Sequence, residues 1–588
     1  MRIIKPLYLS VALACALASC GGAKTMVSTP VENIDNLPLK ITPLAEKDLK
    51  RWSHLDLVKD TVPGMSVDKA YAEIIKNRKG KKVIVAVIDS GIDTLHEDLK
   101  PVLWKNPKEI VGNGKDDDKN GYIDDIYGWN FIGGKNGENV TKDSYEAARV
   151  YHRFKEAFDS IDPTVVKFNA EGFARYDMWR RAKQEIAQNS ESAAELIMLK
   201  RIYANLIKSD SILRKSFGKD TFLGKELATL TVTEPEQKKA KNALYSLMSN
   251  NDALETTNFS FIGDLRAYLD GLESKSKAAE KAPFPFRATI VKDTYDDFND
   301  RFYGNNNVMA SPEAAVHGTH VSGIIGAVRA NEKGGDGVAD NVRIMTIRAV
   351  PDGDEHDKDI ALAIRYAVDN GAQIINMSFG KSFSPEKKWV DEAVAYAASR
   401  DVLLVHAAGN DGRNLDTSYN FPTSRFIDDK RAGNWITVGA SGDPLAGGIT
   451  AGFSNYGKEE VDVFAPGVKI YSTVPGGNTY QFLQGTSMAS PVVAGLAALL
   501  LEYYPSLSAR QIKEVIERSS LPISDSVRTP GTGQLTTLSN LSKTGGLVNA
   551  YEAVKLAASI KGERKLSVNK MSEKAATLPP VPKKTKGF

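Results

Sequence analysis

The sequence of 588 residues has little cysteine and little net charge, and each deficit excludes a class of protein. Its two cysteines, Cys15 and Cys20, both lie near the N-terminus, so a disulfide framework cannot hold the fold together. The formal net charge is +3, from 76 Lys and Arg against 73 Asp and Glu, which gives no reason to expect a nucleic-acid partner. With 42% apolar residues, the composition is instead that of an ordinary globular protein, long enough for a large core and additional segments.

The apolar run at the N-terminus is too short for a comfortable membrane span and has the layout of a targeting signal. It follows Arg2 and Lys5 and ends in LASC, whose cysteine is Cys20. This ending resembles the lipobox of bacterial lipoproteins, in which a peptidase cuts before a cysteine that is then lipidated. We expect a signal peptide at residues 1–19, lipid attachment at Cys20 and a linker over 20–51, with a chance LASC as the alternative. Because no acidic residue directly follows Cys20, the expected location is the outer membrane of a bacterial cell envelope.

From Trp52 onward, apolar β-branched runs alternate with helical patterns. The run at 83–88 is followed by an aspartate, and similar runs recur at 343–347, 373–377 and 402–405. Continuous apolar runs of this length are typical of parallel strands that are buried on both faces. The alternation predicts an α/β fold with a mainly parallel sheet between helices. Ligand sites in such sheets lie at the carboxyl ends of the strands.

Four polar residues follow these strands or begin helices: Asp89, His317, Asn410 and Ser487. Taken alone, Asp89 could belong to a plain turn, His317 could start a helix, and Ser487, in GTSMASP, could be the N-cap of a buried helix. A nucleophilic serine needs a base, a residue that orients the base, and donors for the oxyanion. The joint presence of these residue types favours a nucleophilic site over four separate structural roles.

The motifs VIDSGID, HGTHVSG, INMSFG, AAGN and GTSMASP together resemble those of subtilisin-like (subtilase) serine endopeptidases. The resemblance implies the three-layer subtilisin-like fold of that family. It also implies that Ser487 is the nucleophile, His317 the general base and Asp89 the residue that orients the imidazole. Asn410 would then donate its side-chain amide to the oxyanion, together with the backbone amide of Ser487.

The same resemblance identifies the edges that bind substrate. Ser378, Phe379 and Gly380 match the strand with which the substrate backbone pairs, and the opposing edge is expected near Gly353. Pairing through main-chain hydrogen bonds would admit varied protein and peptide substrates. The two acidic residues that follow Gly353 are expected to favour basic residues upstream of the cut.

The segment GNGKDDDKNGYIDD has the spacing of a calcium loop of the EF-hand type. The candidate metal positions are Asp116, Asp118, Asn120, Tyr122 and Asp124. Position 12 of the loop is Tyr127, where a bidentate Glu belongs, so we expect calcium with modest affinity. A solvated acidic turn is the alternative.

An insertion divides the predicted catalytic domain. Residues 140–285 have no counterpart in the family, and apolar stripes at three- and four-residue spacing predict an inserted helical subdomain there. The catalytic domain then consists of 52–139 and 286–558, and the basic, proline-containing residues 559–588 are expected to form a disordered tail. The insertion is either a passive decoration or a lid or substrate-selecting surface, and the sequence leaves both open.

The expected function is that of an extracytoplasmic serine endopeptidase, held at the membrane by an N-terminal lipid and stabilised by structural calcium. It would hydrolyse peptide bonds of protein or peptide substrates through the triad and an acyl-enzyme. The alternative is a catalytically inactive relative that acts as a binding module or as an envelope lipoprotein.

Overall fold

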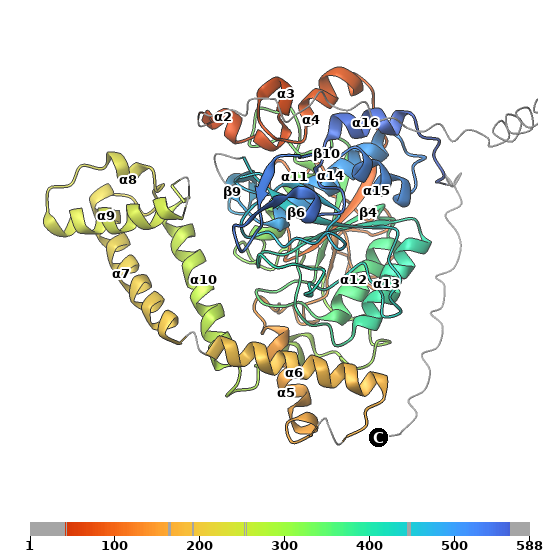
Figure 1. Cartoon of the computed structure of the whole chain (residues 1–588), viewed down its shortest axis with the longest axis horizontal. Helices are drawn as coiled ribbons and strands as arrows, with labels where there is room; N and C mark the ends of the chain where they lie inside the picture. The colour runs from red at the N-terminus through yellow and green to blue at the C-terminus, as the bar shows by residue number, and fades with distance from the viewer. Residues whose placement is uncertain are drawn as a thin grey trace, which may run out of the picture.

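The computed structural model describes residues 42, 44–162, 166–190, 193–251, 253–254, 256–443 and 448–564 (Figure 1). The predicted signal peptide, Cys20, the linker as far as residue 41, and residues 565–588 of the predicted tail lie outside the described residues.

A mainly parallel sheet lies at the centre of the fold. Its strands, among the described residues, are β1 (Val83–Asp89), β2 (Gly128–Asn130), β3 (Val342–Arg348), β4 (Ile374–Met377), β5 (Leu403–Ala407), β6 (Trp435–Ser441), β7 (Val463–Pro466), β10 (Leu521–Pro522) and β13 (Gly546–Leu547). Their order is β10-β13-β7-β6-β5-β4-β1-β3-β2. Each neighbouring pair is parallel except β10 with β13. Two hairpins lie outside this sheet, β8 (Ile470–Val474) with β9 (Thr479–Leu483) and β11 (Ser526–Arg528) with β12 (Leu535–Thr537).

Helices cover both faces of the sheet, which confirms the predicted three-layer α/β fold. Along β1, Val85 and Val87 pack into one core cluster, whereas Ala86 and Ile88 pack into another. The first cluster includes residues of α11 (Val316–Gly326), α14 (Thr486–Tyr503), α15 (Ala509–Arg518) and α16 (Ala550–Ala558). The second includes residues of α12 (Asp357–Asp369) and α13 (Lys387–Ser399). Because successive strand residues point to opposite faces, a strand covered on both sides has to be apolar throughout.

Helix α14 is the most apolar of the core helices that bear on the site. By length and composition it could cross a membrane, but 94% of its apolar window is buried inside the protein. It contacts β4, β5, β6 and β7 along one face of the sheet. These contacts identify it as a core helix, and they fix the place of its N-terminus relative to the strands.

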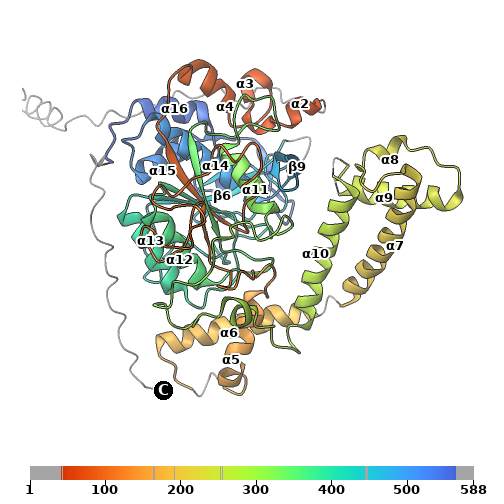
Figure 2. The same ribbon diagram turned by 180° about the vertical axis from the view of Figure 1, so that it is seen from behind.

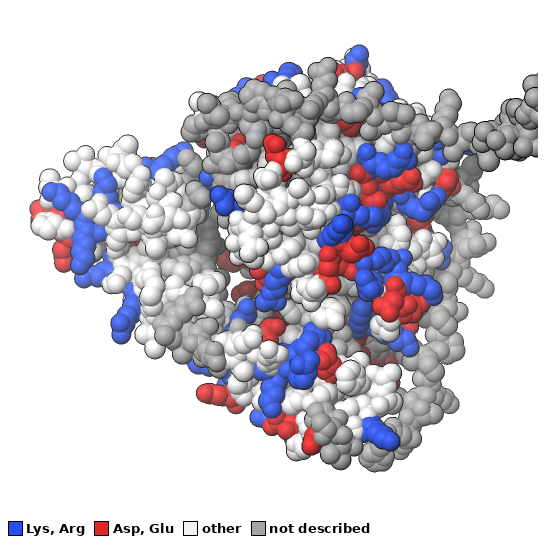
Figure 3. All heavy atoms as spheres, viewed as in Figure 1, with Lys and Arg blue, Asp and Glu red and all other residues white. Residues whose placement is uncertain are grey.

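The insertion is helical and divides into two packed parts. Its helices are α5 (Glu146–Phe158), α6 (Ala170–Ser190), α7 (Ala193–Phe217), α8 (Glu226–Thr229), α9 (Pro235–Asn250) and α10 (Asn258–Lys277). Helices α5 and α6 share a core cluster with Phe383 of the catalytic domain. Helices α7 and α9 form a separate cluster, and in Figures 1 and 2 they extend with α8 and α10 as an arm beside the catalytic domain. The space-filling view is hollowed between this arm and the catalytic domain (Figure 3).

At both ends of the described chain, residues beyond the predicted boundaries of the catalytic domain pack against it. Leu44 and Leu49, assigned to the linker, pack against the core, and α2 (Glu46–Leu49) precedes α3 (Leu57–Asp60) and α4 (Val67–Lys69). At the other end, Arg564, assigned to the tail, lies 3.0 Å from the Asp401 carboxylate and donates to the Leu507 carbonyl. Apolar contacts and an ion pair therefore hold short segments that composition alone assigned to flexible ends.

Candidate active site

The candidate catalytic residues meet at the carboxyl edge of the sheet. Asp89 is the last residue of β1, and Asn410 lies in the loop after β5. His317 and Ser487 are each the second residue of a helix, α11 and α14 respectively. The residues come from segments far apart in the sequence, and the order of the parallel strands brings these segments together.

Asp89 and His317 form a direct hydrogen bond. His317 Nδ1 lies 2.7 Å from Asp89 Oδ1, which also accepts the backbone amide of Ser90 at 2.7 Å. A Cβ at Gly318 would lie 2.2 Å from the Gly91 carbonyl oxygen, so glycine is needed where α11 approaches the turn after β1. Burial lowers the pKa of His317, but the charge of Asp89 and its hydrogen bond together raise it by more, so the net shift is upward.

The second histidine of the motif has a different environment. His320 is fully buried, and its Nε2 lies 3.0 Å from the Gln481 carbonyl oxygen. Burial lowers the pKa of His320 to about 3, so it stays neutral near pH 7. Of the two histidines in the motif, His317 is the one that can exchange a proton with the site.

Ser487 lies in the first turn of α14 but does not cap it. The N-cap is Gly485, so the interpretation of Ser487 as an N-cap is wrong. Its Oγ donates to the Ser378 carbonyl at 3.1 Å, and Ser378 Oγ donates to the Ser487 carbonyl at 2.9 Å. Within the described part of the chain, Ser487 Oγ makes no hydrogen bond to His317. Its backbone amide is one of the first-turn amides that have no partner inside the helix.

Asn410 is held in one orientation beside Ser487. Its Oδ1 accepts the backbone amide of Thr486 at 2.9 Å and the Thr486 hydroxyl at 3.0 Å. The same hydroxyl accepts the backbone amide of Gly409 at 2.9 Å. Because Oδ1 is occupied, Nδ2 remains as a donor, and among the described residues it has no hydrogen-bond acceptor. The site thus presents two donors, Asn410 Nδ2 and the Ser487 amide.

Along the two predicted substrate-binding edges, some backbone amides and carbonyls have no hydrogen-bond partner among the described residues. Asp352 pairs through both its amide and its carbonyl with residues 141–143 at 2.9 and 2.8 Å. The amide and carbonyl of Gly353, like those of Gly380, have no hydrogen-bond partner in the described chain. A Cβ at Gly380 would lie 2.2 Å from Asn420 Oδ1, so this edge approaches the neighbouring loop too closely for a side chain.

The expectation that the acidic residues after Gly353 favour basic substrates is wrong for Glu355. Only 2% of Glu355 is exposed, and burial raises the pKa of its carboxyl to about 8. The Asp354 carboxylate accepts the backbone amide of Glu146 at 2.7 Å and so caps helix α5. The first helix of the insertion thus contacts the Asp354 carboxylate and, through Arg149, the backbone carbonyls of both residues, which the local sequence could not indicate.

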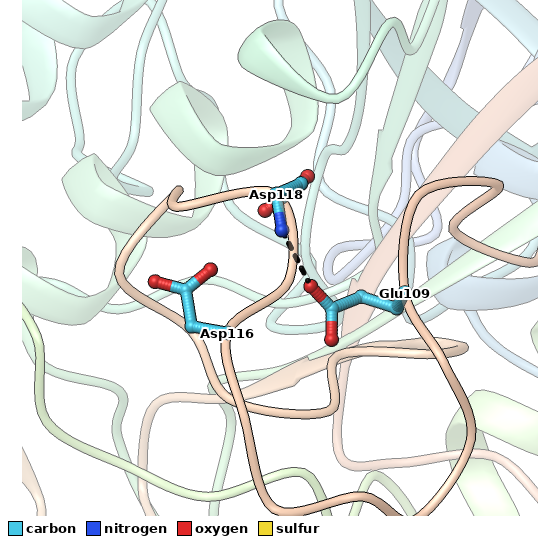
Figure 4. Close-up of side chains that lie close together, drawn as sticks. All are labelled: Glu109, Asp116 and Asp118. Atoms are coloured by element: carbon cyan, nitrogen blue, oxygen red, sulfur yellow. Dashed lines mark hydrogen bonds between the residues drawn. The ribbon is translucent and has the colours of Figure 1, made fainter.

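In the acidic loop, three carboxylates converge (Figure 4). Each of Glu109, Asp116 and Asp118 offers an oxygen, and these oxygens lie within 4.8 Å of one another. Glu109 Oε1 accepts the amides of Asp117 and Asp118, whereas Oε2 is buried and has no partner among the described residues. The sequence pattern did not indicate Glu109, because it lies seven residues before Asp116, the first position of the loop.

Of the predicted acidic positions, Asp124 does not join this cluster. The Asp124 carboxylate accepts the amides of Asn113 and Gly114 at 3.2 and 2.8 Å, and so closes its own loop. Asn120 Oδ1 accepts the amide of Tyr122 at 2.8 Å. The Tyr122 ring is buried among aromatic side chains, those of Trp129, Phe131, Phe302 and Tyr366. The Asp124 carboxylate is therefore corrected from a candidate ligand to a loop residue. Asn120 and Tyr122, whose loop position would bind through its backbone carbonyl, stay predictions.

A carboxylate bonded to an imidazole, beside a serine and an amide donor at a helix N-terminus, is the arrangement of a serine hydrolase. The model of the Subtilase family matches residues 80–551, so this chain belongs to the subtilase family.

Individual relatives match over smaller segments. The chain is 41% identical over 241 residues to the "Thermophilic serine proteinase" of Bacillus sp. (strain AK1), covering 40% of this chain and 52% of that protein. It is 39% identical over 214 residues to "Subtilisin DY" of Bacillus licheniformis, covering 36% and 72%. The chain thus spans about half the length of the first relative. A solved structure, "Prenylagaramide maturation protease PagA", is 28% identical over 41% of this chain and 82% of that chain, with a TM-score of 0.34. With so low a TM-score, this likeness adds nothing to the description of the fold.

Proposed function

We propose that this protein is a serine endopeptidase that hydrolyses peptide bonds through an acyl-enzyme on Ser487. The observation that carries the proposal is the 2.7 Å bond between His317 and Asp89, at the same sheet edge as Ser487 and Asn410. Membership of the subtilase family supports it.

In the proposed mechanism, the bond to Asp89 keeps the proton of the neutral imidazole on Nδ1 and leaves Nε2 as the base. Ser487 Oγ turns from the Ser378 carbonyl toward Nε2, attacks the peptide carbonyl carbon and gives its proton to Nε2. Asp89 stabilises the imidazolium that forms. Asn410 Nδ2 and the Ser487 amide donate to the oxyanion.

The intermediate collapses when the C–N bond breaks and His317 gives its proton to the leaving amine. The acyl group remains on Ser487. Water then attacks this ester, with His317 again as base, and releases the carboxylic acid and the free serine. The substrate backbone would lie between the unpaired groups of Gly353 and Gly380, where main-chain hydrogen bonds fix it with little demand on its side chains.

We further propose structural calcium at Glu109, Asp116 and Asp118. Calcium prefers carboxylate and carbonyl oxygens, and the buried Oε2 of Glu109, which has no partner in the described chain, fits such a cation. The ion would balance three carboxylates in one loop and so stabilise the region before β2. It would take no part in the chemical steps.

The proposed location is outside the cytoplasm, at the bacterial outer membrane, through a lipid on Cys20. The support is the LASC ending of the N-terminal apolar run, and Cys20 lies outside the described residues. Outside the cytoplasm, a chain without disulfides has to obtain its stability from core packing and from bound calcium.

Cleavage of an unfolded protein tests the activity. The full chain and its Ser487→Ala variant are incubated with a reduced, denatured protein, and new N-termini are identified by mass spectrometry. We expect new termini only with the unmodified chain. Equal cleavage by both chains would assign the activity elsewhere, and no cleavage by either would favour the inactive binding lipoprotein.

A further inference from the structure

A buried ionic cluster lies directly behind the two edges proposed to bind substrate. Lys381 follows Gly380 in the chain, and its side chain is 2% exposed. Its Nζ lies 2.8 Å from Glu146 Oε2, 2.8 Å from Asp357 Oδ1 and 2.8 Å from the Glu355 carbonyl oxygen. One ammonium group therefore joins the Gly380 edge, the chain after Gly353 and helix α5 of the insertion.

A second cation of the insertion holds the chain after Gly353. Arg149, one turn along α5 from Glu146, lies 2.6 Å from the Glu146 carboxylate. Its guanidinium also donates to the backbone carbonyls of Asp354 and Glu355, each at 3.0 Å. Five donors in a planar fork suit such simultaneous contacts. The insertion, through Arg149, and the catalytic domain, through Lys381, thus hold the backbone beyond Gly353 together.

The insertion also contacts Gly353 itself. A Cβ at Gly353 would lie 2.2 Å from the Asp143 carbonyl oxygen, and the φ of Gly353 is +126°, a conformation that suits glycine. Lys381 is tied on its other side to Phe421, with backbone hydrogen bonds of 3.1 and 2.8 Å. The two edges are therefore joined to each other through residues 141–149 of the insertion, and Figures 1 and 2 both place α5 against the catalytic domain.

We propose that the first helix of the insertion positions the substrate, with Glu146 and Lys381 as positioning residues that hold Gly353 and Gly380 at the spacing of a bound peptide backbone. The proposal rests on the proposed function. It gives residues 141–149 a role in substrate binding, beyond decoration of the fold.

The reactivity of Ser487 and the binding of a peptide along the two edges can be measured separately. A small fluorophosphonate reacts with the activated serine and needs only the triad and the oxyanion donors. A peptide of several residues needs both edges as well. Loss of an edge should raise KM for the peptide and leave the rate of fluorophosphonate labelling unchanged.

The variants are Lys381→Met and Glu146→Gln in the full chain, with Lys381→Arg as the conservative variant. Each Met or Gln change leaves an uncompensated charge in a buried cluster. We expect KM for the peptide to rise about 10- to 100-fold with labelling unchanged, and Lys381→Arg to recover most of the loss.

Lys513→Met is the matched control. Lys513 lies on α15, its side chain is 15% exposed, and its Nζ lies 2.8 Å from Asp462 Oδ1. It also binds the carbonyl of Trp435, at the amino end of β6 and thus at the opposite end of the sheet from the site. This variant should melt at a lower temperature with KM unchanged.

Two results would overturn the proposal. In one, KM stays unchanged in both Lys381→Met and Glu146→Gln while they melt earlier, which makes the cluster structural only. In the other, labelling and peptide hydrolysis fall together in the milder Glu146→Gln variant. A lack of labelling in the unmodified chain would instead contradict the proposed function.

Discussion

At the scale of single residues, Asn410 tests the oxyanion site. Its Oδ1 is occupied by Thr486, which leaves Nδ2 as the donor. We predict that Asn410→Ala lowers kcat about 100- to 1,000-fold, the effect of losing such a donor in a subtilisin. KM should change little, because the donor acts on charge that develops in the transition state. Steady-state kinetics on one peptide measure both constants, and a change in KM alone would contradict this role.

The titration of His317 gives a second prediction at this scale. In the proposed mechanism the neutral imidazole is the active form, so kcat/KM of the free enzyme should rise with pH as the imidazolium loses its proton. Because Asp89 gives the pKa of His317 a net upward shift, the midpoint should lie above the ordinary value of about 6.5. The measurement is a pH profile with a peptide that has no ionisable side chain. A flat profile, or a midpoint below 6.5, would contradict His317 as the base.

At the scale of elements, α14 carries the proposed nucleophile at its N-terminus and packs in the core, and its packing sets a stability prediction. Leu499 is fully buried in this helix. Leu499→Ala should lower the free energy of unfolding by about 2–5 kcal/mol, through lost burial and the cavity that remains. Leu535, on β12, is 72% exposed, and Leu535→Ala should stay within about 0.5 kcal/mol. Denaturant unfolding measures both changes, and equal effects would place α14 outside the stable core.

The sequence predicted best those elements whose neighbours in the fold restrict every position to one type of residue. A strand such as β1 has to be apolar at every position because helices cover both faces, so its run is visible in the sequence. Residues that follow such strands, among them Asp89 and Asn410, meet at one edge of the sheet, so their shared location could be predicted. The pairing of His317, which lies on a helix, with Asp89 was expected only from the family motifs.

The parts that the sequence could not predict depend on contacts between distant segments. Helical periodicity predicts the helices of the insertion, but not that α5 binds the Glu355 backbone carbonyl through Arg149 and Lys381 through Glu146. In the acidic loop, the spacing favoured Asp124, whereas the fold brings in Glu109 and turns the Asp124 carboxylate to two loop amides. Spacing along the sequence indicates local geometry only. The contacts of α5 and the set of carboxylates in the acidic loop both depend on residues that folding brings together from distant parts of the chain.

At the scale of the whole molecule, calcium should contribute to stability. A chelator should lower the melting temperature of the unmodified chain, because a ligand at 100 times its Kd stabilises the folded state by about 2.7 kcal/mol. Glu109→Gln removes one carboxylate of the cluster, so this variant should melt earlier and respond less to the chelator. Calorimetry with and without calcium measures both effects. An equal chelator response in the two chains would place any calcium elsewhere.

Covalent labelling tests most directly whether Ser487 is an activated nucleophile. The full chain is treated with a fluorophosphonate and digested, and the adduct is mapped by mass spectrometry beside the His317→Ala variant. We expect a single adduct on Ser487, which forms far more slowly in the variant without His317. An adduct on another serine, or labelling of Ser487 at the same rate in both chains, would contradict it.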